Sequence, residues 1–305
     1  MSTINLTTFH KAISKHKILS CLVHYRDNEV LRHFSNKKSE HQLHTINSVT
    51  KTIVGLLVGI ALEEKLIESI DMPISTYFPE YINLFYDSRK QDITLRHLLS
   101  MTDGMDWPEF GSWNFFAPMV YQSDIIAYIL SRPMLHAPGT VMNYNSGSSH
   151  LIGAIIQKVS NQKLHEYAKE KLFQPLGIIE SHWHEKQGVS LASDGLKLKI
   201  DDMLKFGKLI LKNGQKIIPE DWIRTMTTPN LKTYASLGYY GYHIWVDEYQ
   251  GTSYHYALGY GGQFLVIVPK HSLVIALTSR LYKDSMFPLQ LMKEHILDCI
   301  GEIKQ

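Results

Sequence analysis

The sequence predicts an α+β fold in which a sheet domain, built from both ends of the chain, has a helical domain inserted between its two halves. Three observations support this prediction. Strand-like runs occur near the start of the chain, helical segments fill its middle, and further strand-like runs precede a last helix. We expect residues 1–70 and 180–305 to form the sheet domain and residues 71–179 the helical domain, with the active site in the cleft between them.

The first part of the sheet domain begins with a hairpin. Residues 21–25 and 30–34 are rich in β-branched and aromatic side chains, and the four residues between them favour a turn. A long apolar run follows and predicts a buried helix over about 52–68, which the turn at residues 71–73 ends.

Helical patterns dominate the middle of the chain, and strand character returns late. Loops that contain proline and glycine separate the predicted helices. The predicted helices are residues 95–101, 123–130, 149–159 and 164–173, the late strands are residues 242–246, 264–268 and 273–278, and the last helix is residues 288–300.

Composition indicates an ordinary globular protein and disfavours nucleic-acid binding. The 305 residues are 44% hydrophobic and 20% charged, which is enough to bury a large core. The formal net charge is only +2, and lysine and arginine are spread along the chain rather than gathered in a basic patch. We also expect no signal peptide and no membrane span, because no apolar stretch has the required length or flanks.

Cysteine and histidine give no sign of a metal centre. Cys21 and Cys299 lie at opposite ends of the chain without disulfide or metal spacing, so we expect free thiols in a reducing cytoplasm. The 16 histidines are scattered and lack companion ligands at metal-binding spacing. We therefore expect neither a metal nor another cofactor.

A serine and a lysine stand three residues apart at the start of the apolar helix. Ser48 and Lys51 would share one helix face, and aliphatic surroundings lower the pKa of a lysine toward that of a usable base. This is the layout of a serine nucleophile with a lysine base. Alternatively, Ser48 caps the helix and Lys51 extends to solvent. The spacing alone has little value, because it recurs in polar surroundings at Ser14/Lys17, Ser35/Lys38 and Ser160/Lys163.

A polar stretch, residues 137–150, leads from a turn into a further apolar helix and contains Tyr144. A cationic lysine nearby favours the phenolate of a tyrosine. Tyr144 could then share the proton removed from the serine and return it to the leaving group. Alternatively, Tyr144 packs on the next helix with its hydroxyl bonded to the backbone.

Three glycines, Gly259, Gly261 and Gly262, stand just before the strand predicted at residues 264–268. Glycine lets backbone amides approach a ligand closely, as an oxyanion hole requires. A β-bulge or a tight turn is the other interpretation.

Taken together, these segments resemble the penicillin-recognising serine hydrolases. The resemblance is to the branch of class C β-lactamases, D-alanyl-D-alanine peptidases, family VIII esterases and 6-aminohexanoate-dimer hydrolases. Residues 48–51 (Ser-Val-Thr-Lys) match the first family motif and residues 144–146 (Tyr-Asn-Ser) the second, with residues 257–259 (Ala-Leu-Gly) in the place of the third. The likeness runs from about residue 20 to about residue 300 and includes residues 95–107, 138–139 and 172–178.

The resemblance implies a β-lactamase/transpeptidase-like fold, with an antiparallel sheet flanked by helices and an inserted all-helical domain. It implies that Ser48 is the acylated nucleophile and that Lys51 and Tyr144 handle the proton. It also implies an oxyanion hole formed by the backbone N–H groups of Ser48 and Tyr260.

Two departures from the family pattern concern the substrate. Ala257 stands where β-lactamases and peptidases carry Lys or His, so the cation expected to meet a substrate carboxylate is missing. His255 is a candidate to replace it, although its register argues against this. Ser146 ends the second motif where the β-lactamase branch usually has Asn, which removes an amide that would hold a substrate carbonyl.

Aromatic residues could form an apolar acyl pocket. Trp107 and Trp113, together with the aromatic run at residues 239–245, are the candidates, and packing in the core is the alternative for each of them.

We therefore expect a cytoplasmic serine hydrolase that acts on small esters or amides through an acyl-enzyme, without a cofactor and with weak or no β-lactamase activity. The alternatives are a β-lactamase, a D-Ala-D-Ala peptidase, or a catalytically silent sensor of penicillin-like ligands.

Overall fold

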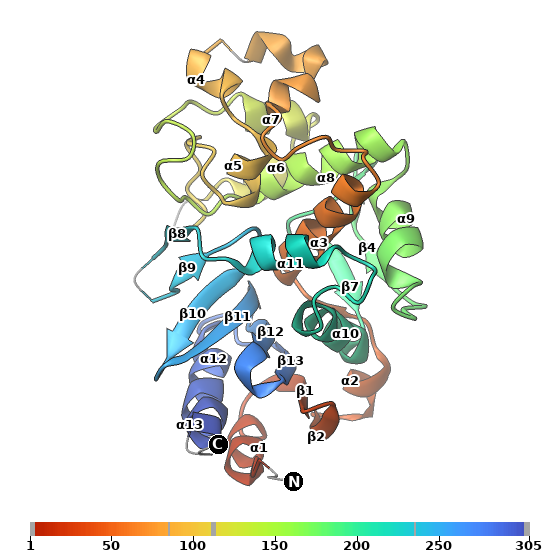
Figure 1. Cartoon of the computed structure of the whole chain (residues 1–305), viewed down its shortest axis with the longest axis vertical. Helices are drawn as coiled ribbons and strands as arrows, with labels where there is room; N and C mark the ends of the chain where they lie inside the picture. Colours follow the sequence, from red (N-terminus) through yellow and green to blue (C-terminus); the bar gives the residue numbers. More distant parts are fainter. Residues whose placement is uncertain (1–3, 85, 111–113, 235, 302–305) are drawn as a thin grey trace.

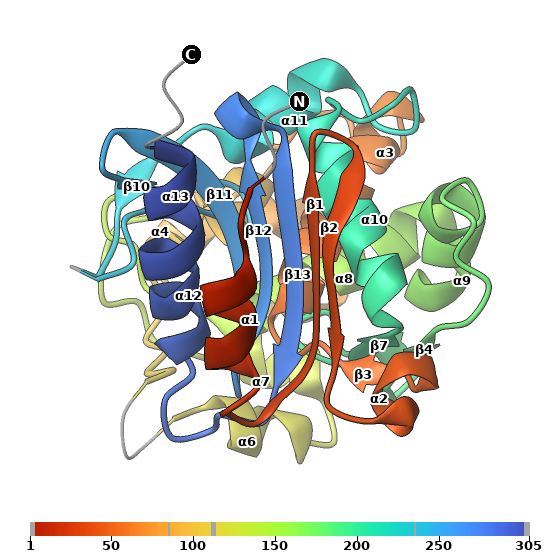
Figure 2. The ribbon, with the colours of Figure 1, turned by 90° about the horizontal axis from the view of Figure 1, so that it is seen from below.

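The centre of the molecule is an eight-stranded antiparallel sheet, seen in a computed structural model that describes residues 4–84, 86–110, 114–234 and 236–301. Its strand order is β2-β1-β13-β12-β11-β10-β9-β8, so strands from the two ends of the chain meet where β1 pairs with β13 (Figure 2). The strands are β1 (Ile18–Tyr25), β2 (Asn28–Phe34), β8 (Leu231–Lys232), β9 (Tyr239–Tyr240), β10 (Trp245–Tyr249), β11 (Thr252–Gly259), β12 (Gln263–Val268) and β13 (Leu273–Ser279).

Two short sheets accompany the large one. The sheet nearest the site described below pairs β3, which precedes Ser48, with β7. Their strands are β3 (His44–Thr45), β4 (His182–Trp183) and β7 (Leu196–Leu198) in one sheet, and β5 (Glu185–Lys186) and β6 (Val189–Ser190) in the other.

Strands β12 and β13 are buried along their whole length, which explains their nearly unbroken apolar sequence. Successive side chains of a strand point to opposite faces. Phe264 and Val266 therefore join one hydrophobic cluster, while Leu265 and Ile267 join the other. Such strands need cover on both faces of the sheet.

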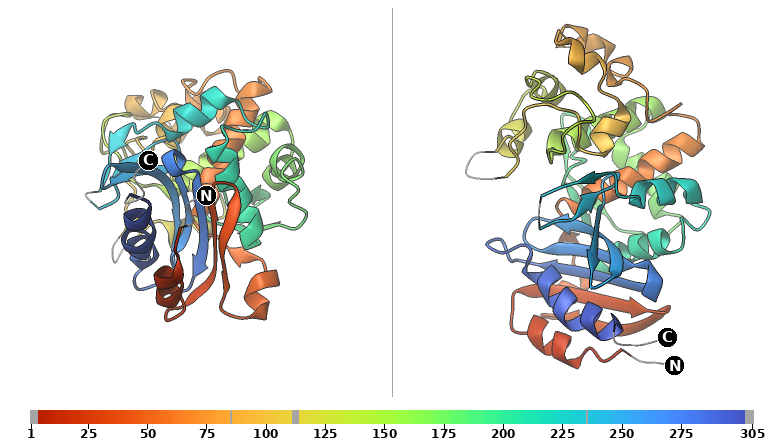
Figure 3. Two further views of the ribbon diagram at one scale, coloured as in Figure 1. Left: turned by 60° about the horizontal axis from the view of Figure 1, so that its bottom comes forward. Right: turned by 60° about the vertical axis from the view of Figure 1, so that its left-hand side comes forward.

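Helices from different parts of the chain supply this cover (Figures 2 and 3). Helices of the two chain ends lie on one face, where Phe9 and Met292 enter the same cluster as Phe264. The other face carries helices from the first and last thirds of the sequence. The first group is α1 (Thr7–Ile13), α12 (Phe287–Met292), the π-helical turn Lys293–Leu297 and α13 (Asp298–Gly301), and the second group is α3 (Val49–Glu63), α10 (Ile200–Leu211) and α11 (Glu220–Thr227).

Most of the remaining helices lie at the end of the molecule opposite both termini (Figure 1). One hydrophobic cluster continues from Leu265 in the sheet through Leu57 on α3 to Ile152 on α8, so the two regions share a core. The helices in this region are α4 (Ser88–Gln91), α5 (Leu95–Leu99), α6 (Phe116–Val120), α7 (Ile125–Leu130) and α8 (Ser146–Ser160), with 3-10 turns at Ile74–Thr76 and Pro79–Leu84. Elsewhere, α2 (Lys37–His41) lies beside β1 and β2, α9 (Leu164–Ala168) and the π-helical turn Lys169–Phe173 follow α8, and a 3-10 turn at Pro269–His271 joins β12 to β13.

The predicted fold class, hairpin and buried helix are confirmed, and several details need correction. Helix α3 begins at Val49, so the Ser-x-x-Lys segment forms its first turn. The strand expected at residues 242–246 begins only at Trp245, because the backbone bends at His243, whose φ is +57°. Helices α1, α10 and α11 and strand β11 were not predicted.

The described residues contain neither a membrane-spanning helix nor a metal-binding cluster, and the two cysteines are not cross-linked. Among the described residues, no helix has the length and apolar character needed to cross a bilayer. Within the same residues, no group of three or more His, Cys, Asp or Glu side chains is arranged to hold a metal ion. Both cysteines are free thiols, Cys21 buried and Cys299 exposed.

Candidate active site

Ser48 immediately precedes α3, and its hydroxyl meets Lys51 rather than the helix backbone. Residue 48 has helical backbone angles and makes no side-chain capping bond. Instead, Lys51 Nζ donates a hydrogen bond to Ser48 Oγ at 3.0 Å. Ser48 therefore occupies the N-cap position without capping the helix through its side chain, and the serine and lysine of the first motif are in direct contact.

Lys51 is buried in the first turn of α3, with 1% of its surface exposed, so the solvent-directed alternative is wrong. Its Nζ also donates to Ser146 Oγ at 3.1 Å and to the Ser193 carbonyl at 2.9 Å. Together with Ser48 Oγ, these oxygens use the three N–H groups of an ammonium. A neutral amine keeps only two N–H groups, which leaves a lone pair that can face Ser48 Oγ.

Other aromatic rings hold Tyr144 just before α8. Its ring stacks on Phe110 at a centroid distance of 5.4 Å and on Trp245 at 5.7 Å, and it meets Tyr240 edge to face at 6.2 Å. Lys51 Nζ lies 4.8 Å from the centroid of the Tyr144 ring, within the range of a cation–π contact. The second motif is thus packed directly against the lysine of the first.

The hydroxyl of Tyr144 has no hydrogen-bond partner among the described residues. Its backbone N–H donates to Tyr234 Oη at 3.2 Å. The alternative with the hydroxyl bonded to the backbone is therefore wrong. Because Lys51 lies against the ring and not at the hydroxyl, proton exchange between the two requires a shift of the lysine or an intervening group.

The segment before Ser48 is fixed against the turn between β11 and β12. Asn47 Nδ2 donates to the Tyr260 carbonyl at 2.6 Å. Gly259 permits a close approach, because a Cβ there would lie 2.4 Å from the Ile46 carbonyl oxygen. Ser48 and Tyr260 are thereby brought onto adjoining segments, and neither backbone N–H donates a hydrogen bond within the described part of the chain.

Gly261 and Gly262 form the turn itself, with φ values of +83° and +82° that glycine adopts without steric cost. The Gly261 N–H donates to Ser285 Oγ at 2.9 Å, and Ser279 Oγ donates to the Gly262 carbonyl at 3.0 Å. The tight-turn interpretation is therefore correct for these two glycines. Residues 257–259, in contrast, lie on strand β11 and not in a loop.

A carboxylate that the sequence did not reveal lies beside Lys51. Glu109 accepts hydrogen bonds from the Ser146 hydroxyl, from the Ser146 N–H at 3.2 Å and from Trp107 Nε1 at 2.6 Å. Ser146 also accepts from Lys51, so it links the lysine to the carboxylate. Glu109 lies in an irregular loop, and only its closeness to Trp107 in the sequence could have indicated it.

The tryptophans proposed for an acyl pocket do not provide one in the described structure. Trp107 is 0% exposed, and its ring packs edge to face against Phe115 and Tyr128. Core packing is the correct interpretation for Trp107, which reaches the site only through Glu109. Trp113 lies outside the described residues.

Buried Asp103 fixes the start of α8, where the second motif lies. Asn145 caps the helix by accepting from the Ser148 N–H at 3.1 Å. Asn145 Nδ2 and Ser148 Oγ in turn donate to Asp103, at 3.3 and 2.6 Å. Burial raises the pKa of Asp103, and the hydrogen bond from Ser148 opposes this effect. The aspartate therefore holds the flanking Tyr144 and Ser146 in place.

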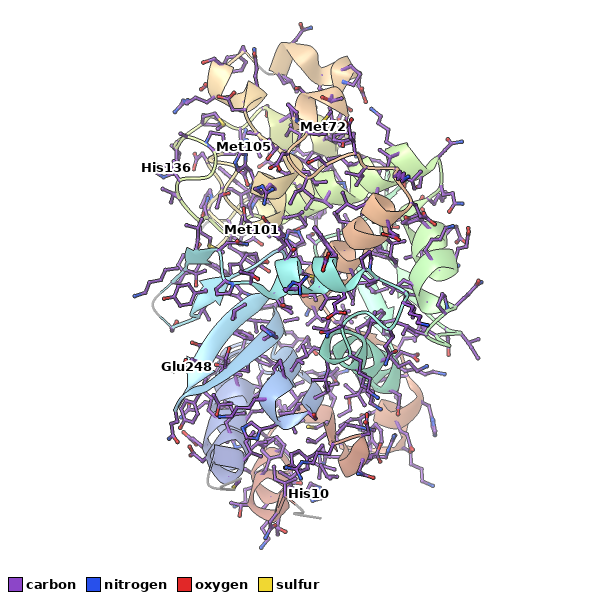
Figure 4. The ribbon with its side chains drawn as sticks, in the orientation of Figure 1. His10, Met72, Met101, Met105, His136 and Glu248 are labelled. Atoms are coloured by element: carbon purple, nitrogen blue, oxygen red, sulfur yellow. The ribbon has the colours of Figure 1, made fainter. Side chains whose placement is uncertain are left out.

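Met101 makes a second contact with this helix start. It lies between the upper helices and the edge strands in Figure 4, at a backbone φ of +59°. Its sulfur accepts from the Asn145 N–H at 3.3 Å, and its carbonyl accepts from the Asn143 N–H at 2.8 Å. The loop after α5 thus helps to orient the second motif.

The carbonyl that holds Lys51 belongs to a loop from the second half of the chain. Ser193 is fully buried, and its hydroxyl donates to Asp194 Oδ1 at 3.3 Å. Burial raises the pKa of Asp194, while the charge of Lys51 lowers it and that of Glu109 raises it further. Asp194 and Glu109 are therefore both within electrostatic range of the site.

His255 and Ala257 lie on the same face of β11, two residues apart. Ala257 is buried in the cluster against which α3 packs. Burial lowers the pKa of His255 to about 4, so its imidazole is neutral at pH 7. The suggestion that His255 replaces the missing cation is therefore wrong near neutral pH.

His243 is a buried histidine behind α3. Its carbonyl accepts from Thr52 Oγ1 at 2.7 Å, and its Nδ1 lies 3.0 Å from the Leu99 carbonyl oxygen. Burial, and to a lesser extent the charge of Lys51, lowers the pKa of His243 to about 3. The imidazole of His243 is thus neutral near pH 7 and lies within electrostatic range of Lys51.

Comparison with known proteins agrees with this arrangement. Residues 15–292 match the family model described as Beta-lactamase. The chain is 28% identical over 161 residues to Beta-lactamase-like protein 2 of Dictyostelium discoideum, a match that covers 50% of this chain and 28% of that protein. It is 27% identical over 150 residues to Esterase EstB of Burkholderia gladioli, covering 46% of this chain and 38% of the esterase. The first curated relatives are thus matched over about a third of their length.

Solved structures show the same fold over nearly the whole chain. A protein from Bacillus anthracis assigned as a 6-aminohexanoate-dimer hydrolase superposes with a TM-score of 0.80, covering 97% of this chain and 83% of that chain at 22% identity. At this level of identity the comparison establishes a shared architecture.

Proposed function

Because the chain belongs to the beta-lactamase family, we propose that it is a serine hydrolase that cleaves small esters or amides through an acyl-enzyme on Ser48. The observation that carries this proposal is the 3.0 Å hydrogen bond from buried Lys51 Nζ to Ser48 Oγ. A serine becomes a useful nucleophile when an adjacent base can remove its proton. The similarity to an esterase supports ester substrates in particular.

The first chemical step is attack of Ser48 Oγ on the substrate carbonyl carbon. Neutral Lys51 accepts the hydroxyl proton while the new C–O bond forms. The carbonyl oxygen becomes an oxyanion, which the N–H groups of Ser48 and Tyr260 stabilise. The hydrogen bond between Asn47 and the Tyr260 carbonyl supports this pairing, because it joins the two segments that carry these N–H groups.

The second step returns the proton and then consumes water. The tetrahedral intermediate collapses and the bond to the leaving group breaks. The proton held by Lys51 passes to the leaving oxygen or nitrogen by way of the Tyr144 hydroxyl, which Lys51 reaches by a shift of its side chain or through an intervening group. Water then attacks the acyl carbonyl, Lys51 again accepts a proton, and the product acid leaves Ser48 with its hydroxyl restored. The unpartnered Tyr144 hydroxyl supports its role as the donor.

Neutral substrates suit this site better than carboxylates do. Ala257 supplies no cation, and Glu109 adds a negative charge next to Ser146. Since β-lactam antibiotics and peptide C-termini carry a carboxylate, we favour an esterase or amidase over a β-lactamase or D-Ala-D-Ala peptidase. A silent sensor has no chemical need for a buried lysine bonded to Ser48.

We place the enzyme in the cytoplasm on the basis of its cysteines. Cys21 and Cys299 are both free thiols, as a reducing compartment favours. Burial also raises the pKa of Cys21, which keeps this thiol protonated and unreactive.

A fluorophosphonate probe tests the nucleophile directly. Intact-mass spectrometry should detect one covalent adduct on the wild-type protein and none on Ser48→Ala, which should also lose at least about three orders of magnitude in kcat/KM for p-nitrophenyl butyrate. Ser160→Ala, altered in another Ser-x-x-Lys pair, is the matched control and should behave as wild type. An adduct retained on Ser48→Ala would contradict the proposal.

A further inference from the structure

Glu109 places a fixed negative charge beside the proposed nucleophile. Its three donors are the Ser146 hydroxyl, the Ser146 N–H and Trp107 Nε1. Ser146 and Trp107 are both buried, so these donors cannot turn away into solvent. A chain of three hydrogen bonds, through Ser146 and Lys51, connects the carboxylate to Ser48 Oγ. The carboxylate is thus two hydrogen bonds from Lys51 and three from the serine that would be acylated.

The surroundings of Lys51 disfavour a negatively charged substrate group in addition to the carboxylate of Glu109. The three N–H groups of its ammonium are already used by oxygen atoms of the site. Ala257 offers no cation, and the charge of Glu109 reaches far enough to raise the pKa of Asp194, which burial raises first. The unpartnered donors of the site, the Ser48 and Tyr260 N–H groups and the Tyr144 hydroxyl, serve the reacting groups in the proposed mechanism. A substrate carboxylate therefore finds no second cation beside Lys51 among the residues described above, whereas a substrate cation finds Glu109.

Aromatic faces beside Glu109 remain open to a ligand. Phe110 is 57% exposed and Tyr234 38% exposed, and their rings meet edge to face at 5.5 Å. Phe110 also stacks on Tyr144, so these rings continue into the wall of the site. Aromatic faces attract ammonium groups through their quadrupole. The combination with an adjacent carboxylate matches a cation better than an apolar acyl chain.

We propose that Glu109, together with Phe110 and Tyr234, selects substrates that carry a positively charged ammonium group near the scissile ester or amide bond. This inference rests on the proposed function, because it names the substrate class of the same site. Opposite charges a few ångströms apart in a partly exposed site attract strongly enough for about a tenfold or larger preference in kcat/KM. A carboxylate in the same position should be disfavoured by a similar factor.

A pair of esters of equal shape isolates the effect of charge. The cationic member is p-nitrophenyl 5-(trimethylammonio)pentanoate, and its neutral partner, p-nitrophenyl 6,6-dimethylheptanoate, has carbon in place of nitrogen. Steric fit and leaving group cancel in the ratio of their kcat/KM values. We expect wild type to prefer the cationic ester about tenfold or more, and we expect this ratio to fall as salt screens the charge.

Variants of Glu109 assign the preference to this residue. Glu109→Gln keeps the hydrogen-bond acceptor but removes the charge, and it should bring the ratio close to one. Glu109→Asp keeps the charge and should retain part of the preference. Glu166→Gln removes an exposed carboxylate on α9 and, as the charge-matched control, should leave the ratio unchanged.

The outcomes separate this inference from the proposed function. A wild-type ratio near one, or a ratio unchanged in Glu109→Gln, overturns the cation preference while hydrolysis and labelling of Ser48 still support a serine hydrolase. If neither ester is hydrolysed and the fluorophosphonate probe leaves Ser48 unlabelled, both proposals fail.

Discussion

Lys51 and Lys90 are two buried lysines in this molecule, and they differ in one chemical respect. Each is 1% exposed, and each Nζ lies close to a tyrosine ring, 4.8 Å from the centroid of Tyr144 and 4.9 Å from that of Tyr86. Lys51 donates to two hydroxyl groups and one carbonyl. Lys90 donates to two backbone carbonyls.

The difference shows that the partner, and not the burial, distinguishes a candidate base. A hydroxyl can lose its proton to an amine, whereas a carbonyl has no proton to give. The partners of Lys90 are the carbonyls of Leu84 and Leu130, so this lysine joins the 3-10 turn at Pro79–Leu84 to the end of α7. Burial lowers the pKa of Lys90, but no chemistry follows from the lower value. Replacing each lysine in turn by methionine therefore tests whether the hydrogen-bond partners of a lysine, and not its burial, decide its effect on activity.

The largest expected effect is on the activity of Lys51→Met. Methionine has a similar length but accepts no proton, so kcat/KM for a neutral ester should fall by roughly two to four orders of magnitude, the range of general acid–base catalysis. Steady-state kinetics with p-nitrophenyl butyrate measures this loss. Lys90→Met is the matched control and should stay within about threefold of wild type. Equal losses in the two variants would remove the distinction between the lysines.

The next effect concerns the tyrosines beside the two lysines. Tyr144→Phe keeps the stacked ring and its contact with Lys51 but removes the hydroxyl, so acylation should slow by roughly two orders of magnitude. Tyr86→Phe removes the corresponding hydroxyl next to Lys90 and should leave the rate unchanged. Stopped-flow measurement of p-nitrophenol release tests both. Near-normal acylation in Tyr144→Phe would mean that another group returns the proton.

Lys90→Met should reduce stability instead of activity. The change removes the donor from the Leu84 and Leu130 carbonyls, and a buried acceptor left unpaired costs about 1–3 kcal/mol. Denaturation by urea, followed by circular dichroism, measures the free energy of unfolding. An unchanged midpoint would show that other groups satisfy these carbonyls as well as Lys90 does.

The smallest effect is on the pH dependence of stability. Because the pKa of His243 is about 3 in the folded protein, below its ordinary value of 6.5, the unfolded chain binds a proton first as the pH falls below 6.5. Stability from this group is thus complete above pH 6.5 and is lost progressively toward pH 3. Removing the charge in Lys51→Met should raise the pKa of His243 and reduce this loss.

Thermal denaturation between pH 7 and pH 4 tests this prediction, again with Lys90→Met as the control. The decrease in Tm on acidification should be smaller in Lys51→Met than in wild type, and equal to wild type in Lys90→Met. The opposite order would show that the charge of Lys51 does not reach His243.

The sequence could predict those parts of the site that depend on residues close together along the chain. The apolar run after Ser48 indicates a buried helix, and that helix alone brings Lys51 onto the same face. Glu109 and Ser193 escaped prediction because each reaches Lys51 only through tertiary folding, one by way of Ser146 and the other by a backbone carbonyl. No local pattern marks a carbonyl that accepts a bond from a distant side chain.

The fold shows the same division between local and distant information. Strand β11 was not predicted, because Gly259 at its end and the two glycines that follow it are typical of a loop. Tyr254 and Tyr256 nevertheless alternate with more exposed residues, as strand residues do. The strand predicted at residues 242–246 has the wrong beginning, because the positive φ of His243 bends the backbone before the strand starts. Both errors arise where the turns at the ends of strands, and not the strands themselves, decide the boundaries.

The pairing of β1 with β13 joins two strands that are far apart in the sequence. Cys21 lies opposite Leu277, so the strand that leads toward the Ser48 helix obtains its inner neighbour only after residue 277 has been made. Translation at 5–20 residues per second leaves β1 without that partner for on the order of ten seconds or more. During this interval the apolar Leu22 and Val23 need protection from aggregation. The sheet against which α3 packs is therefore complete only once β13 has joined β1.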